Sequence, residues 1–261
     1  MTPHQKLQAE SLKHLRDRIY ERYRSVGGAA YLTDDRRSRA PYVNHLIRQH
    51  FPTNREATIL DLGCGSGTFV HFLREAGYRC VSGVDCSREQ VATASETGIE
   101  GIREADLKDA LRTLDDEVLD VVIAFDVIEH MTKPELLEFA DEVYRVLKRE
   151  GRWILHAPNA EALFGSRVRY ADWTHEQAFT KESLEQLFRT VGFNQIHCYE
   201  DEPVIHGLKS FLRWLTWKVV RSVLRTCWLA ETGNTGRECI FSQNLLAVAK
   251  KNSPCLKLSA S

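Results

Sequence analysis

One stretch of this chain constrains its fold more than any other: residues Thr58 to Thr68, which read TILDLGCGSGT. Its first residues are mostly apolar and predict a buried strand, and three alternating glycines follow at Gly63, Gly65 and Gly67. Because glycine has no Cβ, this turn can bend tightly and let a ligand approach the backbone. The stretch therefore predicts a strand, a ligand-binding turn and a helix behind it.

The rest of the chain alternates between strand and helix patterns. Strands are predicted at 58–62, 80–85, 101–104, 118–125, 152–157, 194–199 and 240–249. Helices are predicted at 4–24, 36–50, 67–76, 87–97, 134–149 and 180–191. Pro134 in the first turn and Gly151 just past the end mark the bounds of the helix at 134–149. The alternation predicts an α/β fold, in which a mostly parallel sheet has helices on both faces.

The glycine turn has the form Asp61-x-Gly63-x-Gly65-x-Gly67, and Thr68 stands where a dinucleotide-binding fingerprint needs its third glycine. This form resembles the first motif of class I methyltransferases that use S-adenosylmethionine (SAM). The resemblance implies a Rossmann-like sheet of seven strands, mostly parallel, with the last strand antiparallel. The antiparallel hairpin that closes such a sheet would here be opened by about forty residues between 199 and 240.

The resemblance also implies which residues bind SAM, since ligands of open parallel sheets bind beyond the carboxyl ends of the strands. Asp61 and the glycine turn would hold the methionine part. The Asp85 carboxylate can accept both ribose hydroxyls, and Asp106 would meet the adenine amino group. Taken singly, Asp85 can be a helix cap and Asp106 an exposed turn residue. The predicted SAM contacts are Asp61, Gly63, Cys64, Gly65, Gly67, Asp85, Cys86, Asp106 and Leu107.

The fourth predicted strand runs into Asp126-x-x-Glu129-His130, and a later segment contains His175. This pattern resembles the methyltransferase branch that includes ubiquinone-pathway O-methyltransferases and small-RNA 3′-terminal 2′-O-methyltransferases. In that branch an acidic-x-x-Glu-His cluster and a later histidine surround a divalent metal. The resemblance implies a Mg²⁺, Mn²⁺ or Zn²⁺ site at Asp126, Glu129, His130 and His175. Asp126 replaces the usual glutamate, so a shorter side chain must reach the ion.

These residues point to O-methylation in two ways. A hydroxyl becomes a good nucleophile when its proton is removed or its oxygen binds a cation. Two carboxylates and two imidazoles suit a divalent ion that bridges a vicinal diol. Without a metal, His130 or His175 can serve as the general base beside Asp126. A structural interpretation stays open, in which Glu129 and His130 brace the turn and His175 bonds the backbone of the 158–179 loop.

Residues 206–229 predict a basic amphipathic helix. Its apolar stripe consists of Leu208, Leu212, Leu215, Val219 and Val223. Lys209, Arg213, Lys218, Arg221 and Arg225 flank the stripe, with Trp214, Trp217 and Trp228 among them. Such a helix can lie in a membrane interface, pack on the domain or at a homodimer interface, or form a basic wall for an anionic or nucleic-acid substrate.

Composition sets the remaining limits. With 261 residues and a net charge of −1, the chain has no overall field that would attract nucleic acid. Seven cysteines without a C-x-x-C pair predict a reduced, cytoplasmic protein, which the 206–229 helix could place at the inner face of the membrane. No apolar signal core and no run of eighteen uncharged apolar residues is present in the sequence given.

The predicted organisation has three parts. Residues 1–54 form an N-terminal helical cap, 55–250 the methyltransferase domain, and 251–261 a flexible tail. Within the domain, 158–179 is expected to be an active-site loop and 201–238 a helical insertion before the last strand.

The predicted function is SAM-dependent transfer of a methyl group to a hydroxyl. Residues 55–200, with Pro158-Asn159 and Thr174-His175-Glu176, are similar to bacterial methyltransferases of surface-polysaccharide clusters, which implies a sugar or lipid-linked glycan acceptor. A quinone or phenol, or the 3′ end of an RNA, are alternative acceptors. Near-zero net charge and the lack of a recognised RNA-binding module argue against RNA. An interpretation of another class is a non-catalytic SAM-binding partner protein.

Overall fold

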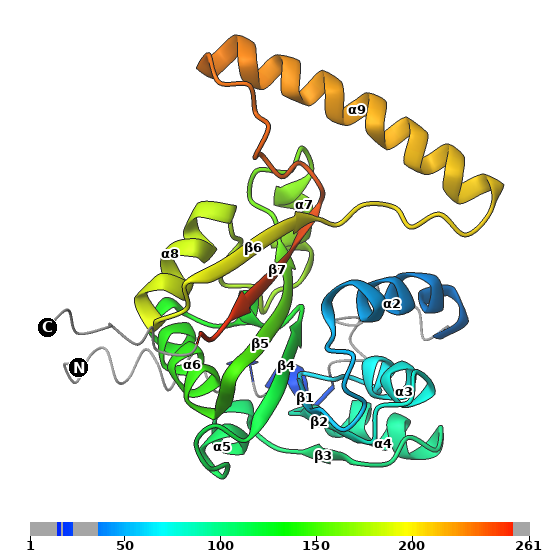
Figure 1. Cartoon of the computed structure of the whole chain (residues 1–261), viewed down its shortest axis with the longest axis vertical. Helices are drawn as coiled ribbons and strands as arrows, with labels where there is room; N and C mark the ends of the chain where they lie inside the picture. The colour runs from blue at the N-terminus through cyan, green and yellow to red at the C-terminus, as the bar shows by residue number, and fades with distance from the viewer. Residues whose placement is uncertain (1–14, 17, 23–35, 253–261) are drawn as a thin grey trace, which may run out of the picture.

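A seven-stranded sheet forms the centre of the protein (Figure 1). The computed structural model describes residues 15, 16, 18–22 and 36–252. The sheet has the order β3-β2-β1-β4-β5-β7-β6, and β7 runs antiparallel to both neighbours while the other pairs are parallel. The strands are β1 (Thr58–Leu62), β2 (Cys80–Asp85), β3 (Ile102–Glu104), β4 (Leu119–Phe125), β5 (Leu147–Pro158), β6 (Gln195–Glu200) and β7 (Asn244–Lys250). This confirms the predicted fold class.

Helices cover both faces of the sheet and bury one hydrophobic cluster against each face. One face carries α2 (Arg36–His50), α3 (Thr68–Glu75) and α4 (Arg88–Glu96). The other carries α5 (Leu107–Arg112), α6 (Lys133–Val146) and α8 (Lys181–Val191). The 3₁₀ turn η1 (Ile128–His130) and α7 (Gly165–Ala171) lie in the connections after β4 and β5.

The structure corrects several predicted bounds. The helix predicted at 134–149 ends at Val146, and Gly151 lies inside β5 rather than beyond a helix end. A Cβ at Gly151 would lie 2.7 Å from the Lys148 carbonyl oxygen, so the strand can bend tightly here only because residue 151 is a glycine. The short helices α5 and α7 were not expected, because six or seven residues give too little periodicity to detect. The helix predicted at 4–24 lies mostly outside the described residues.

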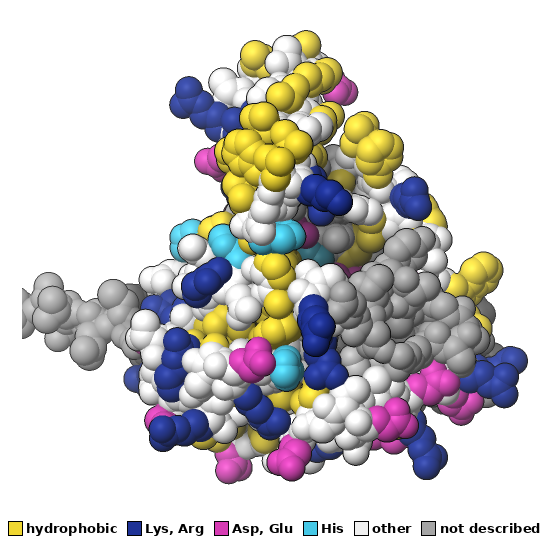
Figure 2. Space-filling view, turned by 90° about the vertical axis from the view of Figure 1, so that its right-hand side faces the viewer, with side chains coloured by type: hydrophobic (Ala, Val, Ile, Leu, Met, Phe, Trp, Pro, Cys, Tyr) yellow, Lys and Arg dark blue, Asp and Glu magenta, His cyan; other side chains and the backbone are white. Residues whose placement is uncertain are grey.

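The insertion between β6 and β7 forms one long helix, α9 (Leu208–Thr232), which stands beyond the end of the sheet (Figure 1). None of its residues is buried. Hydrophobic side chains gather along it at the top of the face in Figure 2. No helix among the described residues is long and apolar enough to cross a membrane.

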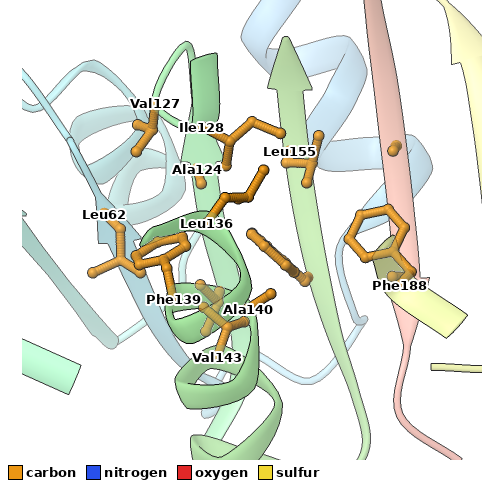
Figure 3. Close-up of a cluster of buried hydrophobic side chains, with 14 of the residues drawn as sticks. Leu62, Ala124, Val127, Ile128, Leu136, Phe139, Ala140, Val143, Leu155 and Phe188 are labelled. Atoms are coloured by element: carbon orange, nitrogen blue, oxygen red, sulfur yellow. The ribbon is translucent and has the colours of Figure 1, made fainter. Parts of the chain in front are cut away.

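Aromatic and aliphatic side chains interlock in the larger cluster, between α6 and the sheet (Figure 3). Helix α6 begins with a capping box of Thr132 and Glu135 and turns Leu136, Phe139 and Val143 toward the strands. The fully buried Phe139 ring meets Trp153 edge to face, with their centroids 5.8 Å apart. This packing fixes the end of β4, from which the polar residues of the site project.

Phe139→Ala is expected to lower the free energy of unfolding by about 3–5 kcal/mol, since it removes a buried ring and leaves a cavity. The matched control is Leu137→Ala, whose side chain is exposed on the same helix and should cost less than about 1 kcal/mol. Urea unfolding of both variants measures the difference. Equal losses for the two would contradict this account of the core.

Candidate active site

A cavity of about 580 Å³ opens at the carboxyl ends of β1, β2 and β4. Eight of the nine predicted SAM contacts line it: Asp61, Gly63, Cys64, Gly65, Asp85, Cys86, Asp106 and Leu107. Gly67 supports the turn from behind, with φ +82°, and a Cβ there would lie 2.3 Å from the Ile102 side chain. The four predicted metal ligands also line this cavity: Asp126, Glu129, His130 and His175.

Asp85 ties the glycine turn to the end of β2. Its Oδ2 accepts a hydrogen bond from the Gly65 N–H at 2.7 Å, and its Oδ1 accepts one from the Ser87 N–H, also at 2.7 Å. Gly63 and Cys64 donate their N–H groups to the Val84 carbonyl oxygen. Each carboxylate oxygen retains a second lone pair, so Asp85 can support the turn and still accept from a ligand.

Two buried carboxylates give this part of the cavity an affinity for cationic groups. Burial raises the pKa of Asp61 well above its ordinary value, and the nearby Asp85 adds to the effect. Burial also raises the pKa of Asp85, against the two backbone hydrogen bonds that favour its charged form. A ligand with an ammonium or sulfonium group relieves this cost, because opposite charge stabilises the carboxylates.

Asp106 caps the N-terminus of helix α5. Its Oδ1 accepts from the N–H groups of Lys108 and Asp109. The residue still lines the cavity, as does Leu107, so contact with adenine stays a prediction. Cys86 is exposed, whereas Cys64 is buried under β2, where a Cβ on Gly83 would lie 2.7 Å from its Sγ. Gly83 therefore lets β2 pass close to the turn.

Three of the four predicted metal ligands come together. One ligand atom from each of Glu129, His130 and His175 lies within 4.8 Å of the others. Glu129 is buried, and its Oε2 has no hydrogen-bond partner among the described residues. The loop that carries His175 is held in place by the Glu129 carbonyl oxygen, which accepts from the N–H groups of Glu176 and Gln177 at 2.7 and 3.1 Å.

The hydrogen bonds of the two histidines orient their rings. His175 Nδ1 lies 3.0 Å from the Val168 carbonyl oxygen, so Nδ1 must donate and Nε2 carries the lone pair in the neutral ring. His130 Nδ1 lies 2.7 Å from Thr174 Oγ1, and the Thr174 hydroxyl donates to Asp172 at 2.6 Å. Thr174 therefore accepts from His130 Nδ1, which places the lone pair of the neutral His130 ring on Nε2.

Burial favours the neutral forms of Glu129 and His130. It raises the pKa of Glu129 well above its ordinary value, and the Asp126 charge adds to this. Burial and the neighbouring His175 lower the pKa of His130 to about 4. A neutral imidazole and a carboxylate that is costly to ionise together favour a bound cation, which would stabilise the charged form of Glu129.

Asp126 does not join this cluster and pairs instead with His156, a residue that the sequence analysis missed. Their Oδ1 and Nδ1 atoms lie 2.6 Å apart, and His156 Nε2 lies 3.4 Å from Asp201 Oδ2. Burial opposes both charges, but the attraction between them holds the pKa of Asp126 low and that of His156 high. Asp126 also has φ +55°, which is unusual for a residue with a side chain.

Residues from the N-terminal part close the cavity on another side. Arg16 donates to the His130 carbonyl oxygen at 2.8 Å and pairs with Glu135. Tyr20 lies edge to face with the His130 ring at 6.0 Å, and Arg39 also lines the cavity. Nothing in the local sequence marks these three residues, because only the tertiary fold brings them to the site. His156 had a weak signal, as a polar residue within a continuously apolar strand.

The geometry agrees with the comparisons to known proteins. A family model described as a methyltransferase domain matches residues 35–198. The chain belongs to this family. The family and the class of methyltransferase that the sequence predicted are confirmed, and SAM is the methyl donor that the name of one relative states.

Curated methyltransferase relatives resemble part of the chain. A protein named "Probable S-adenosylmethionine-dependent methyltransferase" from Mycolicibacterium smegmatis is 28% identical over 136 residues, which is 52% of this chain and 51% of that protein. A "Ubiquinone biosynthesis O-methyltransferase" from Rickettsia bellii is 30% identical over 123 residues, 46% of this chain and 50% of that protein. The chain thus spans about half the length of the curated relatives it matches.

Solved structures of methyltransferases share the fold. A SAM-dependent methyltransferase from Archaeoglobus fulgidus aligns with a TM-score of 0.62 at 22% identity, over 81% of this chain and 94% of that one. A phosphoethanolamine N-methyltransferase from Haemonchus contortus, in complex with SAM, aligns with a TM-score of 0.57 at 18% identity, over 81% of this chain and 52% of that one. These likenesses extend to the fold alone.

Proposed function

We propose that this protein transfers the methyl group of SAM to a hydroxyl of a sugar or a lipid-linked glycan, with the help of a divalent metal ion. The observation that carries the proposal is the convergence of Glu129, His130 and His175 in the wall of the cavity that the SAM motif lines. A carboxylate and two imidazoles are a donor set for activating oxygen nucleophiles.

The donors fit a divalent cation. Glu129 offers a buried oxygen that has no hydrogen-bond partner among the described residues, and the Nδ1 bonds of His130 and His175 place the lone pair of each neutral ring on Nε2. Two nitrogen donors favour Mn²⁺ or Zn²⁺ over Mg²⁺, which prefers oxygen. When bound, such an ion would lower the pKa of an acceptor hydroxyl and hold its oxygen in place. Asp126 would act beside this set rather than in it, since His156 holds its carboxylate.

The chain itself has to align the reactants and dispose of one proton. SAM carries a methyl group on a good leaving group, so in-line placement of the acceptor oxygen is the main requirement. Asp61, Asp85 and the glycine turn would fix the donor, and the loop at 172–177, bonded to Glu129, would exclude water from the cavity. With a pKa of about 4, His130 is a weak base at neutral pH, which supports the metal-assisted version over His130 as the general base.

A phenol acceptor is the second candidate. The relatives named ubiquinone biosynthesis O-methyltransferase favour it, at about 30% identity over half of their length. A catechol presents two neighbouring oxygens, as a sugar diol does, so the same donor set could serve either acceptor.

The test is methyl transfer from labelled SAM by the purified full chain. The acceptors would be sugars with vicinal diols, lipid-linked sugars, catechols and a short RNA with a 3′-terminal diol. We expect transfer to a glycan, a loss of about 10- to 100-fold or more in EDTA, and recovery with Mn²⁺ or Zn²⁺. Undiminished activity in EDTA would exclude the metal, and transfer to catechol or RNA alone would replace the glycan. Tight SAM binding without turnover on any acceptor would favour the non-catalytic partner.

A further inference from the structure

Helix α9 turns its apolar side away from the protein. Its outward side chains include large apolar residues that are all exposed: Leu208, Phe211, Leu212, Leu215, Val219 and Val223. The half-buried side chains centre on another side of the helix: Ser210, Trp214, Trp217, Lys218, Arg221, Leu224, Arg225 and Trp228. A helix that packs on a domain does the reverse and buries its apolar stripe. The alternative in which this stripe packs on its own domain is therefore wrong.

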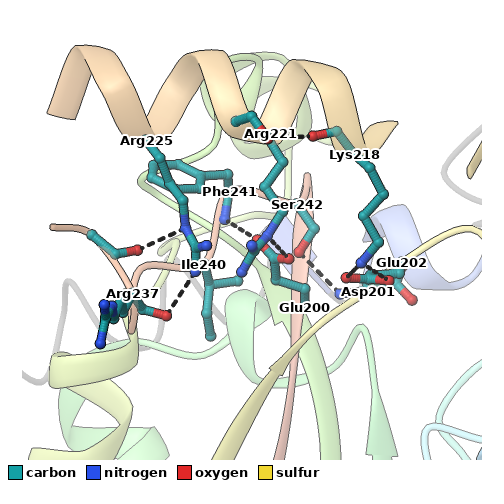
Figure 4. Close-up of polar contacts among 12 residues, drawn as sticks. Glu200, Asp201, Glu202, Lys218, Arg221, Arg225, Arg237, Ile240, Phe241 and Ser242 are labelled. Carbon is teal, nitrogen blue, oxygen red and sulfur yellow. Dashed lines mark hydrogen bonds and ion pairs between the residues drawn. The ribbon is translucent and has the colours of Figure 1, made fainter. Parts of the chain in front are cut away.

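Three cations hold the helix in this orientation (Figure 4). Lys218 pairs with Glu202 at 2.6 Å, and Arg221 pairs with Glu200 at the end of β6. Arg225 donates to the carbonyl oxygens of Gly236 and Arg237, at 3.2 and 3.0 Å. Three of the five basic residues that flank the stripe in sequence therefore bond the helix to the segments that precede and follow it. Lys209 and Arg213 stay exposed, beside the apolar face.

A second set of exposed apolar side chains lies at the same edge of the sheet. It comprises Leu163, Phe164, Tyr170 and Trp173, within and around α7. Trp173 is 82% exposed and Phe164 is 67% exposed. Helix α9 joins the end of β6 to the start of β7, where Asn244 pairs with Pro158 at the carboxyl end of β5. Arg167 of α7 and Asn244 also line the cavity, so α7 and the start of β7, into which the chain from α9 leads, lie at the site.

We propose that α9 and the apolar residues around α7 dock on the surface of an anionic lipid bilayer, which presents an amphiphilic acceptor to the cavity. That the acceptor is a lipid-linked glycan rests on the proposed function, whereas docking on the bilayer does not. Interfacial helices bury an apolar face shallowly and keep cations at its edge, and exposed Trp and Tyr prefer the headgroup level. Lys209 and Arg213 complement negative headgroups, and no acidic residue occurs in α9 before Glu231.

Lipid fits this face better than a second copy of the chain. From Phe211 to Val223 the apolar face covers about 120° of the helix circumference, wider than the narrow seam that pairs helices in a coiled coil. A heptad seam through Leu208, Leu212, Leu215 and Val219 would continue with Ser222 and Thr226, which interrupt it.

The test is flotation of the full chain with vesicles of phosphatidylcholine alone and with added phosphatidylglycerol. The test variant combines Leu212→Glu and Val219→Glu, both at exposed positions where the fold should tolerate them. The control variant combines Thr216→Glu and Cys227→Glu, which add the same charge at exposed positions beside the apolar face. We expect the wild type to bind the anionic vesicles, the test variant to lose about 10-fold or more in affinity, and the control to lose clearly less.

SAM binding, measured by calorimetry, and the circular dichroism spectrum check that each variant is folded. High salt should weaken vesicle binding of the wild type, because part of the attraction is electrostatic. The proposal is overturned if the wild type ignores anionic vesicles or if the test variant binds as well as the wild type. It is also overturned if light scattering shows a dimer that only the test variant dissociates, since a second copy would then cover the face. None of these outcomes depends on which acceptor is methylated.

Discussion

Replacing Glu129 by glutamine is expected to lower kcat/KM for methyl transfer by about 10²- to 10⁴-fold and to leave the affinity for SAM unchanged. The amide keeps the shape of the side chain but lacks the charge that a metal ion requires. Glu129 is buried beside His130 and His175, and its Oε2 has no partner among the described residues. Steady-state kinetics, calorimetry with SAM, and the content of bound Mn²⁺ or Zn²⁺ test the three parts of this expectation.

The matched control is Glu138→Gln on α6, where the exposed carboxylate pairs with Lys108. It should change kcat/KM by less than about 2-fold, as surface substitutions usually do. If Glu129→Gln kept full activity and its bound metal, the proposed role of the cluster would be wrong. Loss of SAM binding in the same variant would instead indicate a distorted cavity.

The second large effect is expected at Asp85. The Asp85→Ala variant should bind SAM about 100-fold more weakly, which corresponds to about 2.7 kcal/mol. It removes the proposed acceptor for the ribose hydroxyls and also leaves the N–H groups of Gly65 and Ser87 without this partner, so the glycine turn loses its tie to β2. Calorimetry with SAM and with S-adenosylhomocysteine measures the affinity.

Asp109→Ala is the control for this measurement, because Asp109 is an exposed aspartate on α5 near the same end of the sheet. Its affinity for SAM should stay within about 2-fold of the wild type. A thermal melt separates loss of binding from loss of folding. Wild-type affinity in Asp85→Ala would show that the ribose is held elsewhere.

Local sequence was enough for the parts of the site that follow directly from strand ends. The glycine turn, Asp85 and the Glu129-His130 pair each lie at the carboxyl end of a strand, and a parallel sheet brings such ends together. His175 could be anticipated through the family resemblance. The remaining contacts depend on segments that are distant in the chain, such as Arg16 bonded to the His130 carbonyl oxygen.

The prediction for Asp126 needed correction, and the alternatives for α9 became fewer, because the partner of a side chain cannot be read from its spacing. Asp126 has the right distance in sequence from Glu129 and His130, yet a buried histidine on the neighbouring strand β5 pairs with it. For α9 the pattern left a membrane interface, packing on the domain or a homodimer, and a basic wall open, and ion pairs of Lys218 and Arg221 turn the apolar stripe away from the domain. In both cases a charged group from another segment outweighs the local pattern.

The bond between His156 and Asp201 links the start of the insertion to the charges of the site. Asp201 is the first residue after β6, on the chain that leads to α9, and it touches the same imidazole that holds Asp126. Losing either carboxylate would leave His156 with a buried charge that is only half compensated. A substitution at any one of positions 126, 156 and 201 would therefore change the charge balance at the other two, so the chain that enters the insertion is electrostatically coupled to the residues around the cavity.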